Sequence, residues 1–139
     1  MQVGYRALIE AAEREIQTIS ARYLPPISAM EAIAALGADD VVCVDLRDIR
    51  ELQREGKIPG AFHAPRGMLE FWVDPDSPYY KDVFGQPKRF VFYCQSGWRS
   101  ALATQAVQRM GLQRTCHIGG GFAGWKAAGG PVEVVERHG

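Results

Sequence analysis

Two short runs of almost wholly apolar residues constrain the fold of this chain. Residues 41–46 read Val-Val-Cys-Val-Asp-Leu, and residues 89–93 read Arg-Phe-Val-Phe-Tyr. Parallel strands that are covered on both faces have this composition, because neither side of the strand meets water. Segments with apolar positions three and four residues apart separate the runs, which indicates helices between strands. This alternation predicts an α/β fold whose parallel sheet carries helices on both faces.

The remaining segments predict shorter elements and a single domain. Ser28 and Glu31 have the spacing of a capping box before a helix over 29–36, and Asp48 is placed to cap a helix through Glu55. The other expected elements are a helix over 5–22 ended by Pro25-Pro26, a strand over 61–64, a helical turn over 67–73, a loop over 74–88, a helix from about 98 to Gly111, a strand over 115–118 and a helix over 122–128. The chain of 139 residues fits one domain, over 26–135, with residues 1–25 as an N-terminal helical extension.

Composition excludes several classes of function. Lys+Arg and Asp+Glu both number 16, so no overall charge attracts nucleic acid or an anionic membrane. No apolar run is long enough to cross a bilayer, and residues 1–6 lack a secretory signal pattern, so we expect a cytoplasmic protein. The three cysteines form no CxxC pair and the three histidines have no ligand spacing. We therefore expect no disulfide framework, no metal and no cofactor.

Residues 94–100, Cys-Gln-Ser-Gly-Trp-Arg-Ser, predict the chemistry. Cys94 ends the second apolar run, and a helix is expected to begin near Trp98 or Arg99. Gly97 permits the tight turn between them. Inward-pointing loop amides, the helix N-terminus and the Arg99 guanidinium all favour an anion at this place. A thiol there ionises more readily than a free cysteine, so we predict thiolate chemistry on anionic substrates at Cys94. Cys43 and Cys116 are expected to be core residues.

The chain resembles the rhodanese-like sulfurtransferase family over roughly residues 26–133. Four segments in the family's order carry the resemblance: Asp45-Leu46-Arg47 followed by Glu51; the turn over 56–61, with Lys57 in place of the family's usual His; the loop over 94–100; and Gly119-Gly120, Trp125 and Gly130-Pro131-Val132 near the end. The resemblance implies a single-domain rhodanese.

The resemblance also implies a reaction and the residues that perform it. Cys94 would attack the outer sulfur of an anionic donor such as thiosulfate, and a cyanide or thiol acceptor would then take the sulfur from the Cys94 persulfide. Arg99 would orient the donor, Arg47 would hold the loop or assist directly, and Asp45 would be structural. The loop residues expected to contact substrate are Gln95, Ser96, Gly97, Trp98 and Ser100.

Access to Cys94 is a separate hypothesis. Trp98 could form an apolar rim over the sulfur together with Phe71 or Trp72, which would exclude water and limit entry to small donors. The alternative is that Phe71 and Trp72 fill the core.

Three other functions stay open at this point. A cysteine phosphatase or arsenate reductase also uses a loop from Cys to Arg, but the phosphatases have five residues between them and this chain has four. A non-catalytic rhodanese-like binding module would usually lack the cysteine that Cys94 supplies. A sulfur carrier that serves a protein acceptor would keep it.

Overall fold

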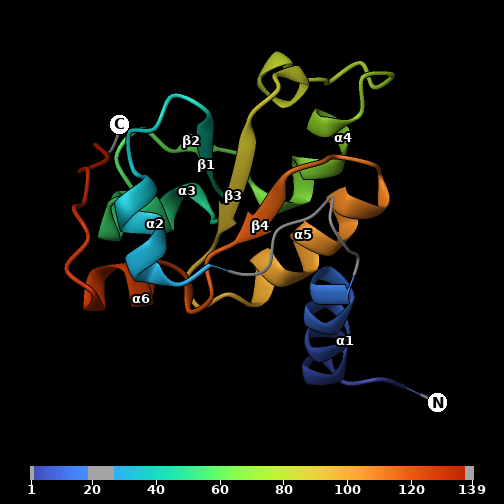
Figure 1. Ribbon diagram of the computed structural model, residues 1–139, viewed down its shortest axis with the longest axis horizontal. Helices are drawn as coiled ribbons and strands as arrows, with labels where there is room; N and C mark the ends of the chain where they lie inside the picture. Colours follow the sequence, from blue (N-terminus) through green and yellow to red (C-terminus); the bar gives the residue numbers. More distant parts are fainter. Residues whose placement is uncertain (1, 19–26, 137–139) are drawn as a thin grey trace.

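A parallel four-stranded sheet forms the centre of the protein. Figure 1 shows the computed structural model, which describes residues 2–18 and 27–136. The strands are β1 (Val41–Asp45), β2 (Phe62–His63), β3 (Arg89–Tyr93) and β4 (Thr115–His117), in the order β2-β1-β3-β4. The two apolar runs pair with each other in the middle of the sheet, with Val41 opposite Arg89 and Asp45 opposite Tyr93. The predicted parallel sheet is confirmed.

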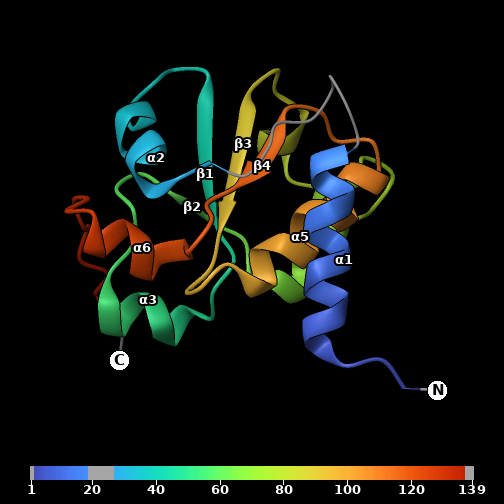
Figure 2. The same ribbon diagram turned by 60° about the horizontal axis from the view of Figure 1, so that its bottom comes forward.

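Helices cover both faces of the sheet, as predicted. Successive residues of β3 point to opposite faces, so Val91 and Tyr93 join one apolar cluster while Phe90 and Phe92 join the other. The helices α2 (Ala29–Ala35) and α6 (Gly121–Ala127) pack on the first face. The helices α4 (Leu69–Val73) and α5 (Trp98–Arg109) pack on the second. Figure 2 shows α2 and α6 on one side of the strands and α5 on the other.

Local capping fixes where two of the helices begin. Ser28 and Glu31 form the predicted capping box at the start of α2. A second capping box begins α3 (Ile49–Glu55), where the Asp48 carboxylate accepts from the amide of Arg50 and Glu51 accepts from the amide of Asp48. Side chains therefore satisfy backbone donors that the first helical turn leaves free. One consequence is that Glu51 is held at the N-terminal end of α3.

The N-terminal helix α1 (Tyr5–Thr18) lies along α5 in both views (Figures 1 and 2). It buries Ile9, Ala12 and Ile16, which lie on one stripe of the helix. The predicted continuation to residue 22, the stop at Pro25-Pro26 and the domain boundary at 25/26 lie outside the described residues. Within residues 2–18 and 27–136, no helix has both the length and the hydropathy that a bilayer crossing requires.

The loop expected over 74–88 is partly helical. A short 3₁₀ helix, η2 (Asp82–Gly85), lies within it, and another, η1 (Arg66–Met68), precedes α4. The ring of Phe84 is 4% exposed and packs against Phe62 and Phe90. Burial of this one ring accounts for the extra helical turn. The sequence did not predict the turn, because a four-residue helix is too short to show an apolar period.

Candidate active site

The carboxyl ends of the central strands converge on Cys94. The cysteine follows β3 directly, and the chain turns through Gly97 into α5. Gly97 has a φ of +96°, a left-handed conformation that residues with a Cβ avoid. The Cys94 side chain is 1% exposed, so the thiol lies at the base of the loop and not on the surface.

Two backbone amides and one hydroxyl surround the Cys94 sulfur. The amides of Gly97 and Ser100 donate to Sγ at 3.2 and 3.4 Å, and the Ser100 hydroxyl oxygen lies 3.7 Å from it. Gly97 is the N-cap of α5 and Ser100 lies in its first turn, where the helix dipole adds partial positive charge. The arrangement stabilises negative charge on the sulfur, as a nucleophilic thiolate needs.

The outer side of the loop is anchored on α6. The amides of Phe122 and Ala123 donate to the carbonyls of Cys94 and Gln95 at 2.8 and 3.0 Å. Gly121 makes this approach possible, because a Cβ there would lie 2.5 Å from the Cys94 carbonyl oxygen. This anchor was not among the site residues predicted from the sequence. The Gly119-Gly120-Gly121 run was the available signal, since close backbone contact requires glycine.

Asp45 and Arg47 form a fully buried ion pair beneath the loop. Arg47 donates to the Asp45 carboxylate at 2.7 Å and to the carbonyl of Gly56 at 2.7 Å. A third bond, of 3.3 Å, reaches the side-chain oxygen of Gln95, and the guanidinium lies 4.3 Å from the centre of the Phe122 ring. Arg47 thus ties the loop to two other segments and has no exposed surface. Of its two expected roles, this geometry favours holding the loop.

Arg99 is paired with Glu51 of α3. Its two terminal nitrogens donate to the two Glu51 oxygens at 2.8 and 2.9 Å. The hydrogen bond to Glu51 is the main cause of a raised pKa at Arg99, and the nearby Cys94 sulfur contributes to it. The same bond holds the pKa of Glu51 below its usual value. The positive charge of Arg99 is therefore partly offset, and the loop amides provide much of the attraction for an anion.

Trp98 contacts the N-terminal helix. Its ring is 47% exposed and lies 5.3 Å from the Tyr5 ring, centre to centre, with the Arg6 guanidinium 5.9 Å away. Phe71 is 53% exposed, so the alternative that it fills the core is wrong. Trp72 is half-buried and packs edge-on against Phe62 in the core. The ring that stands beside Trp98 thus comes from α1.

His117 is brought to the site by β4. Its Nδ1 lies 2.9 Å from the Ser100 hydroxyl oxygen, and its side chain is 3% exposed. Burial lowers the pKa of His117 to about 4, so the imidazole is neutral at physiological pH. It borders a cleft of about 300 Å³ behind the loop, lined by Glu13, Ser96, Gly97, Trp98, His117, Gly119 and Gly120. His117 has no ligand spacing to the other histidines or the cysteines, and only its position near the end of a predicted strand could have marked it.

Cys43 and Cys116 lie away from this arrangement. Cys116 is buried in the first apolar cluster, and the half-buried Cys43 packs against that cluster. Burial raises the pKa of both thiols, for Cys43 to about 11. Neither is placed or ionised as a nucleophile would be, in agreement with the predicted core roles.

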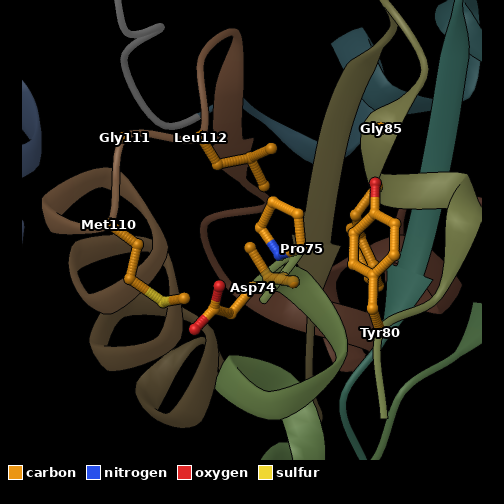
Figure 3. A pocket seen from close by; sticks show the side chains of 9 residues that line it. Asp74, Pro75, Tyr80, Gly85, Met110, Gly111 and Leu112 are labelled. Carbon is orange, nitrogen blue, oxygen red and sulfur yellow. The ribbon is translucent and has the colours of Figure 1, made fainter. Parts of the chain in front are cut away.

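A larger hollow, of about 420 Å³, lies at the opposite end of α5 (Figure 3). Met110, Leu112, Asp74 and Tyr80 are among its lining residues. Cys94 lies before the first turn of α5, and the hollow lies after its last turn, about 18 Å along the helix axis. No cysteine or histidine lines the hollow, so it offers no nucleophile or general base of these types.

Comparisons with known proteins agree with this geometry. A family model described as "Rhodanese-like domain" matches residues 28–128. A solved structure from Rhodopseudomonas palustris, described as a protein of unknown function and possible tyrosine phosphatase, is 49% identical with a TM-score of 0.87 over 96% of each chain. Mouse thiosulfate sulfurtransferase/rhodanese-like domain-containing protein 3 is 28% identical, covering 68% of this chain and 64% of the mouse protein. Human thiosulfate:glutathione sulfurtransferase is 27% identical, covering 73% of this chain and 92% of the human protein.

Proposed function

Because this chain belongs to the rhodanese-like domain family, we propose that it transfers sulfane sulfur from an anionic donor to a thiophilic acceptor through a persulfide on Cys94. The observation that carries the proposal is the convergence of the Gly97 amide, the Ser100 amide and the Ser100 hydroxyl on one buried sulfur. Such a site favours a thiolate and any anion next to it.

The first half-reaction charges the cysteine. The Cys94 thiolate attacks the outer sulfur of thiosulfate, a new S–S bond forms, and the S–S bond of thiosulfate breaks to release sulfite. Arg99, which stands beside the sulfur, orients the anionic donor, and Arg47 keeps the loop in place through Gln95. The loop amides stabilise the negative charge that moves between the sulfur atoms.

The second half-reaction removes the outer sulfur from the Cys94 persulfide. A cyanide ion or a thiolate attacks the outer sulfur of the persulfide, and Cys94 leaves as a thiolate, ready for another cycle. We favour a low-molecular-weight thiol as acceptor, because the human relative is a thiosulfate:glutathione sulfurtransferase. The proposal includes a cytoplasmic location, where such thiols are kept reduced, and cell fractionation tests that part of it.

Intact-mass measurement after mixing with thiosulfate tests the proposal. The wild type should gain one sulfur atom, about 32 Da, and lose it when a thiol or cyanide is added. Cys94→Ser should gain nothing, whereas Cys43→Ser and Cys116→Ser should behave as the wild type. A gain in Cys94→Ser would contradict the assignment, and no gain in any form would favour a binding module.

Phosphatase activity is the second candidate, because the Rhodopseudomonas palustris structure is described as a possible tyrosine phosphatase. The loop argues against it, since only four residues separate Cys94 from Arg99. A shorter loop encloses a smaller cradle, which suits a single sulfur better than a phosphate. Hydrolysis of p-nitrophenyl phosphate, measured for wild type and Cys94→Ser, distinguishes the two functions: turnover that depends on Cys94 would support the phosphatase.

A further inference from the structure

His117 lies next to the strand that leads to Cys94, and the proposed reaction gives it no role. We propose that His117 is a positioning residue, whose imidazole holds the Ser100 hydroxyl in the orientation that donates to the Cys94 sulfur. This inference rests on the proposed role of Cys94 as a nucleophile. If the inference holds, the Cys94 thiolate depends on three elements: the loop, α5 and the strand β4, which carries His117.

The contacts form a continuous chain from the sulfur to the imidazole. The Ser100 hydroxyl oxygen lies 3.7 Å from Cys94 Sγ on one side and 2.9 Å from His117 Nδ1 on the other. All three side chains are buried, with Cys94 at 1%, Ser100 at 0% and His117 at 3% exposure. Water therefore does not compete for these hydrogen bonds, and the direction of the single hydroxyl proton is decided by the two neighbours.

The protonation of the ring decides which neighbour receives that proton. A neutral imidazole carries one N–H, and its other nitrogen is an acceptor. With the proton on Nδ1, His117 donates to the Ser100 oxygen, and the hydroxyl proton is left to point at the sulfur. With the proton on Nε2, Nδ1 would instead accept the hydroxyl proton and draw it away from the sulfur. A negatively charged sulfur selects the first arrangement.

The other ring nitrogen is consistent with this assignment. Nε2 is buried and has no hydrogen-bond partner among residues 2–18 and 27–136. A proton on Nε2 would find no acceptor there, whereas a proton on Nδ1 has the Ser100 oxygen, so the surroundings favour the ring with its proton on Nδ1. Among the residues that the structure describes, the bond from Nδ1 to Ser100 is the one hydrogen bond of this side chain, and it leads to the proposed nucleophile.

Alkylation of Cys94 by iodoacetamide in the full chain measures the effect directly. His117→Asn places an amide nitrogen where Nδ1 stands and can still donate to Ser100. His117→Gln places its polar atoms one bond further out, near Nε2, and cannot make the same contact. We expect His117→Asn to keep most of the wild-type rate constant at pH 7. We expect His117→Gln to lose roughly three- to tenfold, the range of one ordinary hydrogen bond, because the amides of Gly97 and Ser100 still donate to the sulfur.

The same pair of variants in a Ser100→Ala background supplies the control. Without the hydroxyl, the Asn and Gln variants should react at rates within about twofold of each other. A difference that persists without the hydroxyl, or equal rates in its presence, would overturn the proposal. Both variants are polar and of similar size to histidine, and circular dichroism checks their folding. Alkylation does not require sulfur transfer, so failure here is distinguishable from failure of the mass experiment above.

Discussion

The two arginines at the site each have a carboxylate partner, and the two pairs differ in what surrounds them. Arg47 and Asp45 are both fully buried, so neither can approach a donor without the loop opening. Arg99 and Glu51 are 39% and 18% exposed, so both charges are within reach of solvent. If Arg99 binds the anionic donor as proposed, Glu51 competes with that donor for the guanidinium.

Substitutions in the Arg99–Glu51 pair should act in opposite directions. Arg99→Ala removes a charge-assisted contact and leaves the Glu51 carboxylate unpaired, so kcat/KM for thiosulfate should fall by about 10- to 100-fold. Glu51→Gln keeps an oxygen for the capping box but removes the competing charge, so kcat/KM should rise roughly two- to fivefold. Steady-state kinetics with thiosulfate measure both. The control is the rate constant for removal of sulfur from the persulfide by a thiol that carries no other charged group. This rate constant should change little in either variant.

At the scale of elements, the loop over residues 94–100 depends on two neighbouring helices from distant parts of the chain. The N-terminal end of α6 holds the loop carbonyls through the amides of Phe122 and Ala123. The helix α1 supplies the ring that contacts Trp98. The first contact holds the backbone of the loop, and we expect the second to affect which molecules reach Cys94.

Gly121→Ala should damage the loop and Gly119→Ala should not. A Cβ at Gly121 would lie 2.5 Å from the Cys94 carbonyl oxygen and 2.7 Å from that of Gln95, at a φ of +60°. A Cβ at Gly119 meets nothing closer than 3.8 Å. We expect Gly121→Ala to lower the free energy of unfolding by about 2 kcal/mol or more and to slow persulfide formation. Gly119→Ala should stay within about 0.5 kcal/mol of the wild type. Urea unfolding that gave equal stabilities would contradict the anchoring role of α6.

The rim of the site should respond to changes in α1. Trp98→Ala should raise kcat/KM for a bulky thiosulfonate relative to thiosulfate, because the largest exposed ring of the loop is removed. Tyr5→Ala should shift the ratio in the same direction by a few-fold, since the aromatic contact that holds Trp98 contributes about 0.5–1.5 kcal/mol. Tyr79→Ala, another exposed tyrosine, serves as the control. An unchanged ratio in Trp98→Ala would mean that the indole does not limit access.

At the scale of the whole molecule, folding buries an imidazole that would be charged in the unfolded chain below pH 6.5. The pKa of His117 is about 4 in the folded protein, against an ordinary value of 6.5. Between these values the unfolded chain binds a proton that the folded protein does not bind. The contribution of His117 to the free energy of unfolding is therefore fully present above pH 6.5. It is lost as the pH falls toward 4, by about 3 kcal/mol at most.

Urea unfolding of wild type and His117→Asn at several pH values checks this expectation. The variant should show a smaller loss of the free energy of unfolding between pH 6.5 and 4.5 than the wild type. The difference between the two proteins isolates His117, because the carboxylates that titrate below this range are common to both. Parallel pH profiles would show that the imidazole does not control acid stability.

The sequence by itself determined the central strands, a helix cap and the turn at Cys94, each of which a contiguous segment controls. The two apolar runs predicted β1 and β3, because a strand that is buried on both faces is apolar along nearly its whole length. Ser28 and Glu31 predicted their capping box, because the donor and acceptor are three residues apart. The prediction that a cysteine at a strand end meets the N-terminus of a helix depends only on residues 89–100, and the structure has that arrangement.

The tertiary structure decided which distant residues meet at Cys94. Glu51 reaches Arg99 across 48 positions, His117 reaches Ser100 across 17, and Tyr5 lies against Trp98. The order of the strands and the packing of the helices bring these residues together. Both depend on how the whole chain buries its apolar surface, so no local pattern in the sequence predicts them. Arg99, predicted from the sequence as a positive charge beside Cys94, is for this reason paired with Glu51, and the helix predicted as an extension contacts Trp98 of the loop.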